Sequence, residues 1–239
     1  MENEQKSTQY LIPSSIIVAG LLVAFAAVYS NGAPIVKNQE ASGGVVAASD
    51  IGKDMRPVDS TDHILGNPDA PVKIVEYSDL ECPYCKTYHP TLKQIISEYG
   101  KDGKVAWVYR HLPLDRIHSK ARKEAEASEC AAELGGNNAF WAYIDKVFAV
   151  TTSNNRLDLA QLPIIAGQIG LDKTKFETCL SSGRHADSVE ADLQDAIRAG
   201  GDGTPYTVVV TSSGKVYPFS GALPYEQVKG ILDQALSSL

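Results

Sequence analysis

Cys82 and Cys85 are the residues of this chain whose type and spacing point most directly to chemistry. Two thiols separated by two residues can close into a small disulfide ring, which another thiolate can open and re-form. A reduced pair of this kind can also bind zinc, and an oxidised pair can serve as a structural clip. The motif Cys-Pro-Tyr-Cys therefore predicts a redox site, a metal site or a clip.

Zinc fits this motif poorly, because a structural zinc site needs four ligands, usually supplied as two spaced pairs. His89 lies one helical turn after Cys85 and adds a third candidate ligand, but no second pair follows. We interpret the scattered histidines as surface or capping residues: His63, His111, His118 and His185. A clip is disfavoured because so small a ring removes little entropy from the unfolded chain. We therefore interpret the pair as redox-active and expect neither a metal nor an organic cofactor.

The segments on either side of the motif must position the two thiols. Residues 72–79 predict a strand, and residues 86–99 predict a helix. Cys82 is suited to be the N-cap of this helix, with Pro83 at its first position. Unpaired N–H groups at that helix end stabilise a thiolate, so we expect Cys82 to be the exposed nucleophile with a lowered pKa. Cys85, one turn further in, is the expected resolving thiol. Because Tyr84 supplies no positive charge, we expect a milder oxidant than the strongest of this kind.

The rest of the globular part alternates between strand and helix patterns. Its predicted strands and helices are a strand at 105–112, helices at 119–134, 138–149, 158–169, 172–182 and 186–199, strands at 206–210 and 215–219, and a helix at 225–238. The glycines at 135 and 136 are predicted to stop the first helix of this block. The order β-α-β, helices, β-β-α predicts an α/β thioredoxin fold, a central mixed sheet flanked by helices, with an all-helical insertion at about 117–200.

The N-terminal part of the chain predicts a membrane anchor. Residues 11–30 carry no charge and consist mostly of Leu, Ile, Val and Ala. Twenty residues of helix span about 30 Å, the thickness of a bilayer core. The alternative is a cleaved signal peptide, because Ala24-Phe25-Ala26 resembles a cleavage site. We expect a short tail at 1–10, a transmembrane helix at 11–30, a tether at 31–61 and the globular domain at 62–239.

Charge and cysteine content restrict the partners and the compartment. A formal net charge of −7 disfavours binding to nucleic acid. The four cysteines and the lack of a second apolar span favour export of the domain to the periplasm or cell surface. If Cys82 pairs with Cys85, then Cys130 and Cys179 are left to form a second disulfide, the alternative being two buried free thiols.

Two stretches of the sequence resemble DsbA-type thiol:disulfide oxidoreductases of the thioredoxin superfamily. They are residues 70–85, which end in the Cys-Pro-Tyr-Cys motif, and Gly203-Thr204-Pro205 before the late strand. The resemblance implies that Pro205 is cis beside the cysteines and that Thr204 pairs with a bound peptide by strand addition. Taken alone, Thr-Pro would be an ordinary turn.

Glu76 matches the acidic residue that this family buries beneath its disulfide. In an apolar strand, such a carboxyl group should have a raised pKa and could relay a proton to or from Cys85. The alternative is a glutamate at a strand edge that reaches water.

The expected reaction is the introduction of disulfides into exported proteins or peptides that carry thiols, by a monomer attached to the membrane. The resemblance implies a membrane partner that re-oxidises the pair, either DsbB-like or vitamin K epoxide reductase-like. A disulfide reductase or isomerase of the same fold is the nearest alternative. A membrane-tethered peptide-binding or chaperone module, whose cysteines are dispensable, is an alternative of a different class.

Overall fold

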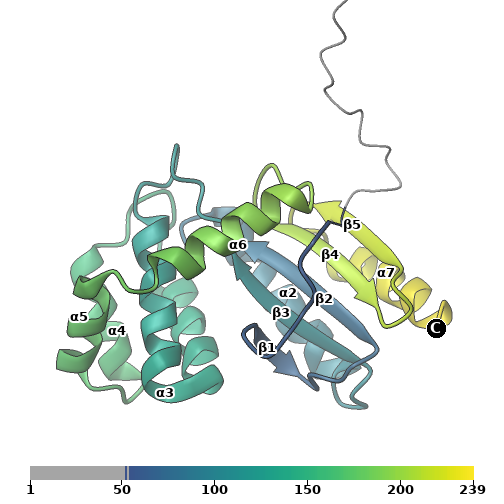
Figure 1. The fold of residues 1–239 in the computed structure, drawn as a ribbon, viewed down its shortest axis with the longest axis horizontal. Helices are drawn as coiled ribbons and strands as arrows, with labels where there is room; N and C mark the ends of the chain where they lie inside the picture. Colours follow the sequence, from purple (N-terminus) through teal and green to yellow (C-terminus); the bar gives the residue numbers. More distant parts are fainter. Residues whose placement is uncertain (1–51, 53) are drawn as a thin grey trace, which may run out of the picture. The chain divides into compact units, whose positions relative to one another are not determined.

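The computed structural model of the protein describes Gly52 and residues 54–239 (Figure 1). The predicted tail at 1–10, the predicted anchor at 11–30 and most of the predicted tether lie outside these residues. Within the described part, no helix combines the length and the apolar character needed to cross a bilayer.

A five-stranded mixed sheet forms the centre of the described part, in the order β1-β3-β2-β4-β5. Its strands are β1 (His63–Gly66), β2 (Val72–Ser78), β3 (Val105–His111), β4 (Tyr206–Thr211) and β5 (Val216–Ser220). β2 and β3 run parallel, and the other neighbours are antiparallel. The predicted thioredoxin-like α/β fold is confirmed. β1 was not predicted, because a four-residue strand at the sheet edge has almost no pattern of its own.

Helices cover both faces of the sheet. α2 (Pro83–Tyr99) and α7 (Tyr225–Ser237) pack side by side on one face, and α6 (Ala186–Arg198) crosses the other face against β3 (Figure 1). Between β3 and β4 the chain is helical: α3 (Ala121–Val150), the short 3₁₀ helix η1 (Leu159–Gln161), α4 (Leu162–Gln168), α5 (Lys173–Ser182) and then α6.

Successive residues of the central strands enter different cores, because side chains alternate across a sheet. In β2, Ile74 belongs to the core under α2 and α7, whereas Val75 and Tyr77 belong to the core under α6. Glu76 follows the alternation and is buried on the α2 face. A carboxyl group in this strand therefore faces the active-site helix.

α3 is interrupted at its centre, where the sequence predicted a stop. Gly136, at φ 73° and ψ −172°, is out of helical geometry, so two helical segments meet there at a kink. The positive φ is tolerated because glycine has no Cβ. The predicted stop at the two glycines is confirmed, and the two predicted helices are the two segments of the kinked element α3.

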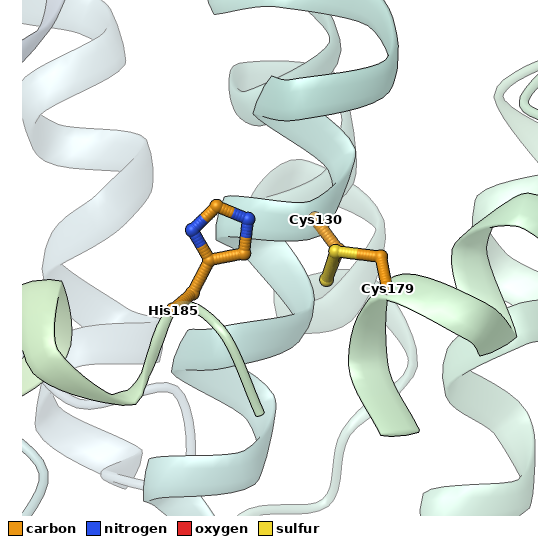
Figure 2. Close-up of side chains that lie close together, drawn as sticks. All are labelled: Cys130, Cys179 and His185. Carbon is orange, nitrogen blue, oxygen red and sulfur yellow. A yellow bond between two sulfur atoms is a disulfide. The ribbon is translucent and has the colours of Figure 1, made fainter. Parts of the chain in front are cut away.

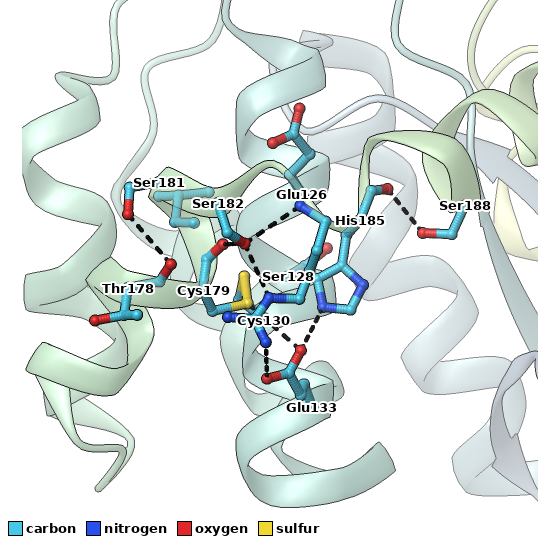
Figure 3. The surroundings of a disulfide bond; sticks show 12 residues. Glu126, Ser128, Cys130, Glu133, Thr178, Cys179, Ser181, Ser182, His185 and Ser188 are labelled. Atoms are coloured by element: carbon cyan, nitrogen blue, oxygen red, sulfur yellow. Dashed lines mark hydrogen bonds and ion pairs between the residues drawn. A yellow bond between two sulfur atoms is a disulfide. The ribbon is translucent and has the colours of Figure 1, made fainter.

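A disulfide joins α3 to α5 inside the helical block. Cys130 and Cys179 are bonded at 2.02 Å with their Cα atoms 5.9 Å apart, and both are almost fully buried (Figure 3). The bond closes a sequence separation of 49 residues. In the chain-entropy description such a loop contributes about 4 kcal/mol, mainly by restricting the unfolded state.

Candidate active site

The two cysteines of the motif lie where β2 leads into α2. Cys82 is the N-cap residue of α2, and Pro83 occupies the first turn, where its missing N–H leaves no hydrogen bond unmade. Both cysteines are free thiols. Cys85 is completely buried, and Cys82 is only 3% exposed. The expectation of an exposed Cys82 is therefore wrong, whereas Tyr84 between the cysteines is 67% exposed.

A loop from the far end of the chain covers Cys82. The Thr204–Pro205 peptide bond is cis. The Cys82 Sγ lies 3.4 Å from the carbonyl oxygen of Thr204, although the two residues are 122 positions apart. The Thr204 Oγ1 atom is buried and has no hydrogen-bond partner among the described residues. The structure therefore places Thr204 and Pro205 directly beside the reactive pair.

The surroundings shift the pKa values of the two thiols in opposite directions. A hydrogen bond from the Cys85 thiol, assisted by Thr204 and by the backbone N–H groups of Tyr84 and Cys85, lowers the pKa of Cys82 to about 6. Complete burial raises the pKa of Cys85 well above its usual value, and the adjacent Cys82 raises it further. At neutral pH the pair thus holds its negative charge on Cys82.

Glu76 lies beneath the pair, on the strand that leads to it. It is 1% exposed, and the indole Nε1 of Trp107 donates a hydrogen bond of 3.0 Å to its Oε2. Burial raises the pKa of Glu76 to about 8, and the charge on Cys82 adds to this. At neutral pH Glu76 is therefore mostly protonated and can donate a proton.

Asp79 joins the turn before the motif to a histidine of the β3–α3 connection. The Asp79 backbone N–H points at Cys85 Sγ at 3.4 Å, and the Asp79 carbonyl accepts from the N–H of Cys82 at 3.1 Å. Its carboxylate accepts from the N–H groups of Glu81 and Leu114 and lies 2.9 Å from Nδ1 of His118. The contact between Asp79 and His118 was not predicted, because no local spacing relates positions 39 residues apart.

Glu81, the residue before Cys82, forms a buried carboxyl pair with Glu124. Both are 0% exposed, and three of their four carboxyl oxygens have no donor among the described residues. The fourth, Oε2 of Glu81, accepts a hydrogen bond from the N–H of Asn155. Burial, together with the nearby Glu81, raises the pKa of Glu124 to about 10. Glu124 is therefore neutral at physiological pH.

Among the described residues, a further group of candidate metal ligands includes the Cys130–Cys179 disulfide. His185 lies beside Cys130 and Cys179 (Figure 2), and its Nε2 is 2.9 Å from Glu133 Oε2 (Figure 3). Because each sulfur is bonded to the other, neither can act as a thiolate ligand. This cluster is a disulfide with an adjacent histidine–carboxylate pair.

The interpretation of the scattered histidines as surface or capping residues is wrong for His111 and His118, which are both buried. His89, the third candidate zinc ligand, is buried as well. Its Nε2 lies 2.6 Å from Asp145, and its ring packs on Trp107 and Phe148. It therefore ties α2 to α3. Sequence spacing could not distinguish these positions, because each partner comes from a distant element.

Known proteins match most of the described part. The sequence profile of a family described as Thioredoxin matches residues 59–234. DsbA2 of Pseudomonas aeruginosa has 30% sequence identity and a TM-score of 0.62, and the match covers 75% of this chain and 96% of that protein. BdbD of Bacillus subtilis in its oxidised form has a TM-score of 0.66 at 23% identity, and the match covers 77% and 97% of the two chains. At that identity the likeness concerns the fold alone.

A third relative shares only a domain with this chain. The protein named Na(+)/H(+) antiporter NhaA 3 of Salinispora tropica is 38% identical over 152 residues, which are 63% of this chain. The match covers 22% of the length of that relative. The similarity thus concerns about a fifth of a much longer protein.

Proposed function

The chain belongs to the thioredoxin family as a DsbA-like thiol:disulfide oxidoreductase, and we propose that it introduces disulfides into exported proteins through Cys82 and Cys85. The observation that carries this direction of electron flow is the low pKa of Cys82, about 6. A stabilised thiolate favours the reduced protein, so the disulfide form gives up its bond readily to a client thiol.

The reaction follows from the geometry of the two sulfurs. A client thiolate attacks Sγ of Cys82 in the Cys82–Cys85 disulfide, the S–S bond breaks, and Cys85 leaves with the electron pair. The new bond is a mixed disulfide between the client and Cys82. A second client thiolate attacks the client sulfur of that bond and expels the Cys82 thiolate. The client loses two electrons, and the protein holds them as its reduced pair.

Glu76 serves the first of these steps. The departing Cys85 sulfur is fully buried, so its charge must be neutralised by a proton. Glu76 is buried on the same side of the sheet and, with a pKa of about 8, carries that proton at neutral pH. In the reverse direction the Glu76 carboxylate takes the proton back, as a general base does.

The cis Thr204–Pro205 segment is the proposed docking edge for the client. The Thr204 carbonyl is 3.4 Å from Cys82 Sγ, so a peptide hydrogen-bonded to this segment as an added strand has its own sulfur near Cys82. We further propose that residues 11–30 anchor the domain outside the cytoplasm, that it acts as a monomer, and that a DsbB-like or vitamin K epoxide reductase-like membrane protein re-oxidises it.

Oxidation of a reduced, unfolded client with known disulfides tests this function. The oxidised wild-type protein should form about one client disulfide per molecule. Cys82→Ser and Cys85→Ser should form none, because neither variant can hold the Cys82–Cys85 disulfide that oxidises the client. The matched control is the double variant Cys130→Ala/Cys179→Ala, which keeps the active pair and should remain an oxidant if folded.

The direction of electron flow is tested separately by equilibrating the Cys82–Cys85 couple with glutathione. We expect a reduction potential between about −200 and −120 mV, the range from glutaredoxin to the strongest oxidants. A value below about −250 mV would assign the protein as a reductase instead. Retained client binding and function in Cys82→Ser would favour a peptide-binding module.

A further inference from the structure

His118 is a buried histidine near the reactive pair that neither the motif nor the family resemblance indicated. It lies in the connection between β3 and α3 and is 4% exposed. Its Nδ1 lies 2.9 Å from Oδ2 of Asp79, and its Nε2 lies 3.4 Å from Oδ1 of Asn154. A histidine ring with an oxygen acceptor at each nitrogen is satisfied on both sides only when both nitrogens carry hydrogen. The geometry thus favours the imidazolium form.

Asp79 is the partner that connects this ring to the cysteines. Its backbone contacts both thiol residues, at Cys85 Sγ and at the N–H of Cys82. Its carboxylate is buried, and burial raises the pKa of Asp79 although the N–H of Leu114 and the ring of His118 oppose this. An uncompensated charge here would repel a thiolate forming one turn away.

The other acidic groups around this turn carry less charge than their number suggests. Glu76 and Glu124 are mostly neutral at pH 7, because burial raises the pKa of each. One carboxyl oxygen of Glu81 accepts a hydrogen bond from the N–H of Asn155. Lys120, which begins α3, reduces the pKa increase of Glu124. Among these carboxyl groups, Asp79 is the one that forms an ion pair with a histidine, at 2.9 Å from His118.

We propose that His118 is a positioning residue for Cys82: held as an imidazolium by Asp79, it cancels the charge of that carboxylate and lets the turn before α2 accept a thiolate. Since Tyr84 is uncharged and 67% exposed, His118 provides from another part of the chain the cation that the Cys-Pro-Tyr-Cys motif lacks. This inference deepens the proposed function, because it rests on Cys82 as the reacting thiol.

Proton affinities agree with this arrangement. Burial alone would lower the pKa of His118, but its hydrogen bond to Asp79 and the charge of Asp79 raise it above its usual value, with smaller effects from Asn154 and Cys82. The coupling between Cys82 and His118 must be reciprocal. A thiolate at Cys82 therefore strengthens proton binding by His118, and the imidazolium strengthens the thiolate.

Charge variants of the reduced full-length protein test the proposal through the ultraviolet absorbance of the Cys82 thiolate against pH. His118→Gln keeps a donor for Asp79 but removes the cation, so the pKa of Cys82 should rise by about one unit, a roughly tenfold loss of thiolate in its titration range. Asp79→Asn/His118→Gln removes both charges and should restore most of that shift. His185→Gln, which removes the histidine–carboxylate pair beside the Cys130–Cys179 disulfide, should leave the pKa of Cys82 unchanged.

The outcomes are decisive in both directions. An unchanged pKa of Cys82 in His118→Gln would overturn the proposal, and so would a shift that persists in full in the double variant. If the variants do not fold, nuclear magnetic resonance of the wild-type ring decides: an imidazolium at pH 7 supports the proposal, and a neutral His118 overturns it. None of these readouts needs a client, so a failed oxidase assignment leaves the test intact.

Discussion

The α6 face of the sheet and the surroundings of the two active-site cysteines bury charged side chains in opposite ways. On the α6 face, Arg110 forms a two-pronged ion pair with Asp62, at 2.8 and 2.9 Å, and a second pair with Asp195 at 2.7 Å. Tyr77 donates to the same Asp195, and Arg56 contacts Asp62. All of these side chains except Arg56 are essentially buried, and every charge has an opposite partner. We call this set the arginine network.

Around the cysteines, the buried carboxyl groups are left partly unmatched. Glu76, Glu81 and Glu124 are buried without an ion-pair partner among the described residues, and only Asp79 has a cationic partner, His118. We call this set the active-site carboxyl cluster. Burial raises the pKa of Glu76 and Glu124, whereas the hydrogen bonds and charge of Arg110 keep that of Asp62 below its usual value despite burial.

The difference separates charges that hold the fold from charges that prepare chemistry. A buried carboxylate with a good ion pair stays ionised and fixes two elements, whereas an unmatched one keeps a proton that it can transfer. The arginine network ties the segment before β1, β3 and α6 together. The carboxyl cluster instead holds protons beside a thiol whose reactions require them.

The largest expected effect comes from breaking the arginine network. Arg110→Ala leaves Asp62 and Asp195 buried without their main partner, so the free energy of unfolding should fall by about 3–5 kcal/mol. Denaturant unfolding measures this loss. The matched control is Lys229→Ala, which removes an exposed ion pair to Asp233 and should leave the free energy of unfolding nearly unchanged. An equally small loss in Arg110→Ala would show that the network contributes little.

Glu124→Gln should instead raise the free energy of unfolding. The pKa of Glu124 is raised in the folded state to about 10, so its stability contribution is fully present below about pH 4.5 and is lost as the pH rises toward 10. Glutamine is neutral at every pH and can donate to Glu81. The variant should therefore exceed the wild type by about 2 kcal/mol at pH 7, with a gap that widens up to about pH 10. A pH-independent difference in unfolding free energy would contradict the assigned proton.

Glu76→Gln should give a smaller gain in stability together with a loss of function. The folded-state pKa of Glu76 is about 8, so the stability that the protonated carboxyl group contributes is lost between about pH 4.5 and 8. The difference in unfolding free energy between Glu76→Gln and the wild type should therefore stop widening near pH 8. We expect about 1 kcal/mol at pH 7, because glutamine also weakens the hydrogen bond from Trp107.

The same variant lacks the proposed relay to Cys85. Mixed-disulfide formation with a client should slow by about a hundredfold, the lower end for general acid–base catalysis. Stopped-flow fluorescence can measure it. Glu124→Gln is the comparison variant, because it replaces the other protonated carboxyl group of the active-site carboxyl cluster. An equal slowing in both variants would assign the effect to the cluster as a whole and not to Glu76.

The local residue pattern was sufficient to predict the strands and helices whose apolar residues follow a clear pattern. The strand before Cys82 and the helix after it follow from neighbouring residues, and β3 and β4 are apolar runs of the right length. β1 was missed because its four residues are stabilised only by pairing with β3. The predicted stop at the two glycines is confirmed as a kink, because Gly136 takes a positive φ that interrupts the helical geometry.

Residues close together in the sequence were enough to predict the thiol pair and its helix N-terminus, because the dipole and the free N–H groups act within one turn. Which buried charges find partners was decided only by the tertiary structure. His118 meets Asp79 across 39 residues, and Arg110 meets Asp195 across 85. Charge pairing depends on distances between packed elements, and such distances leave no period in the sequence.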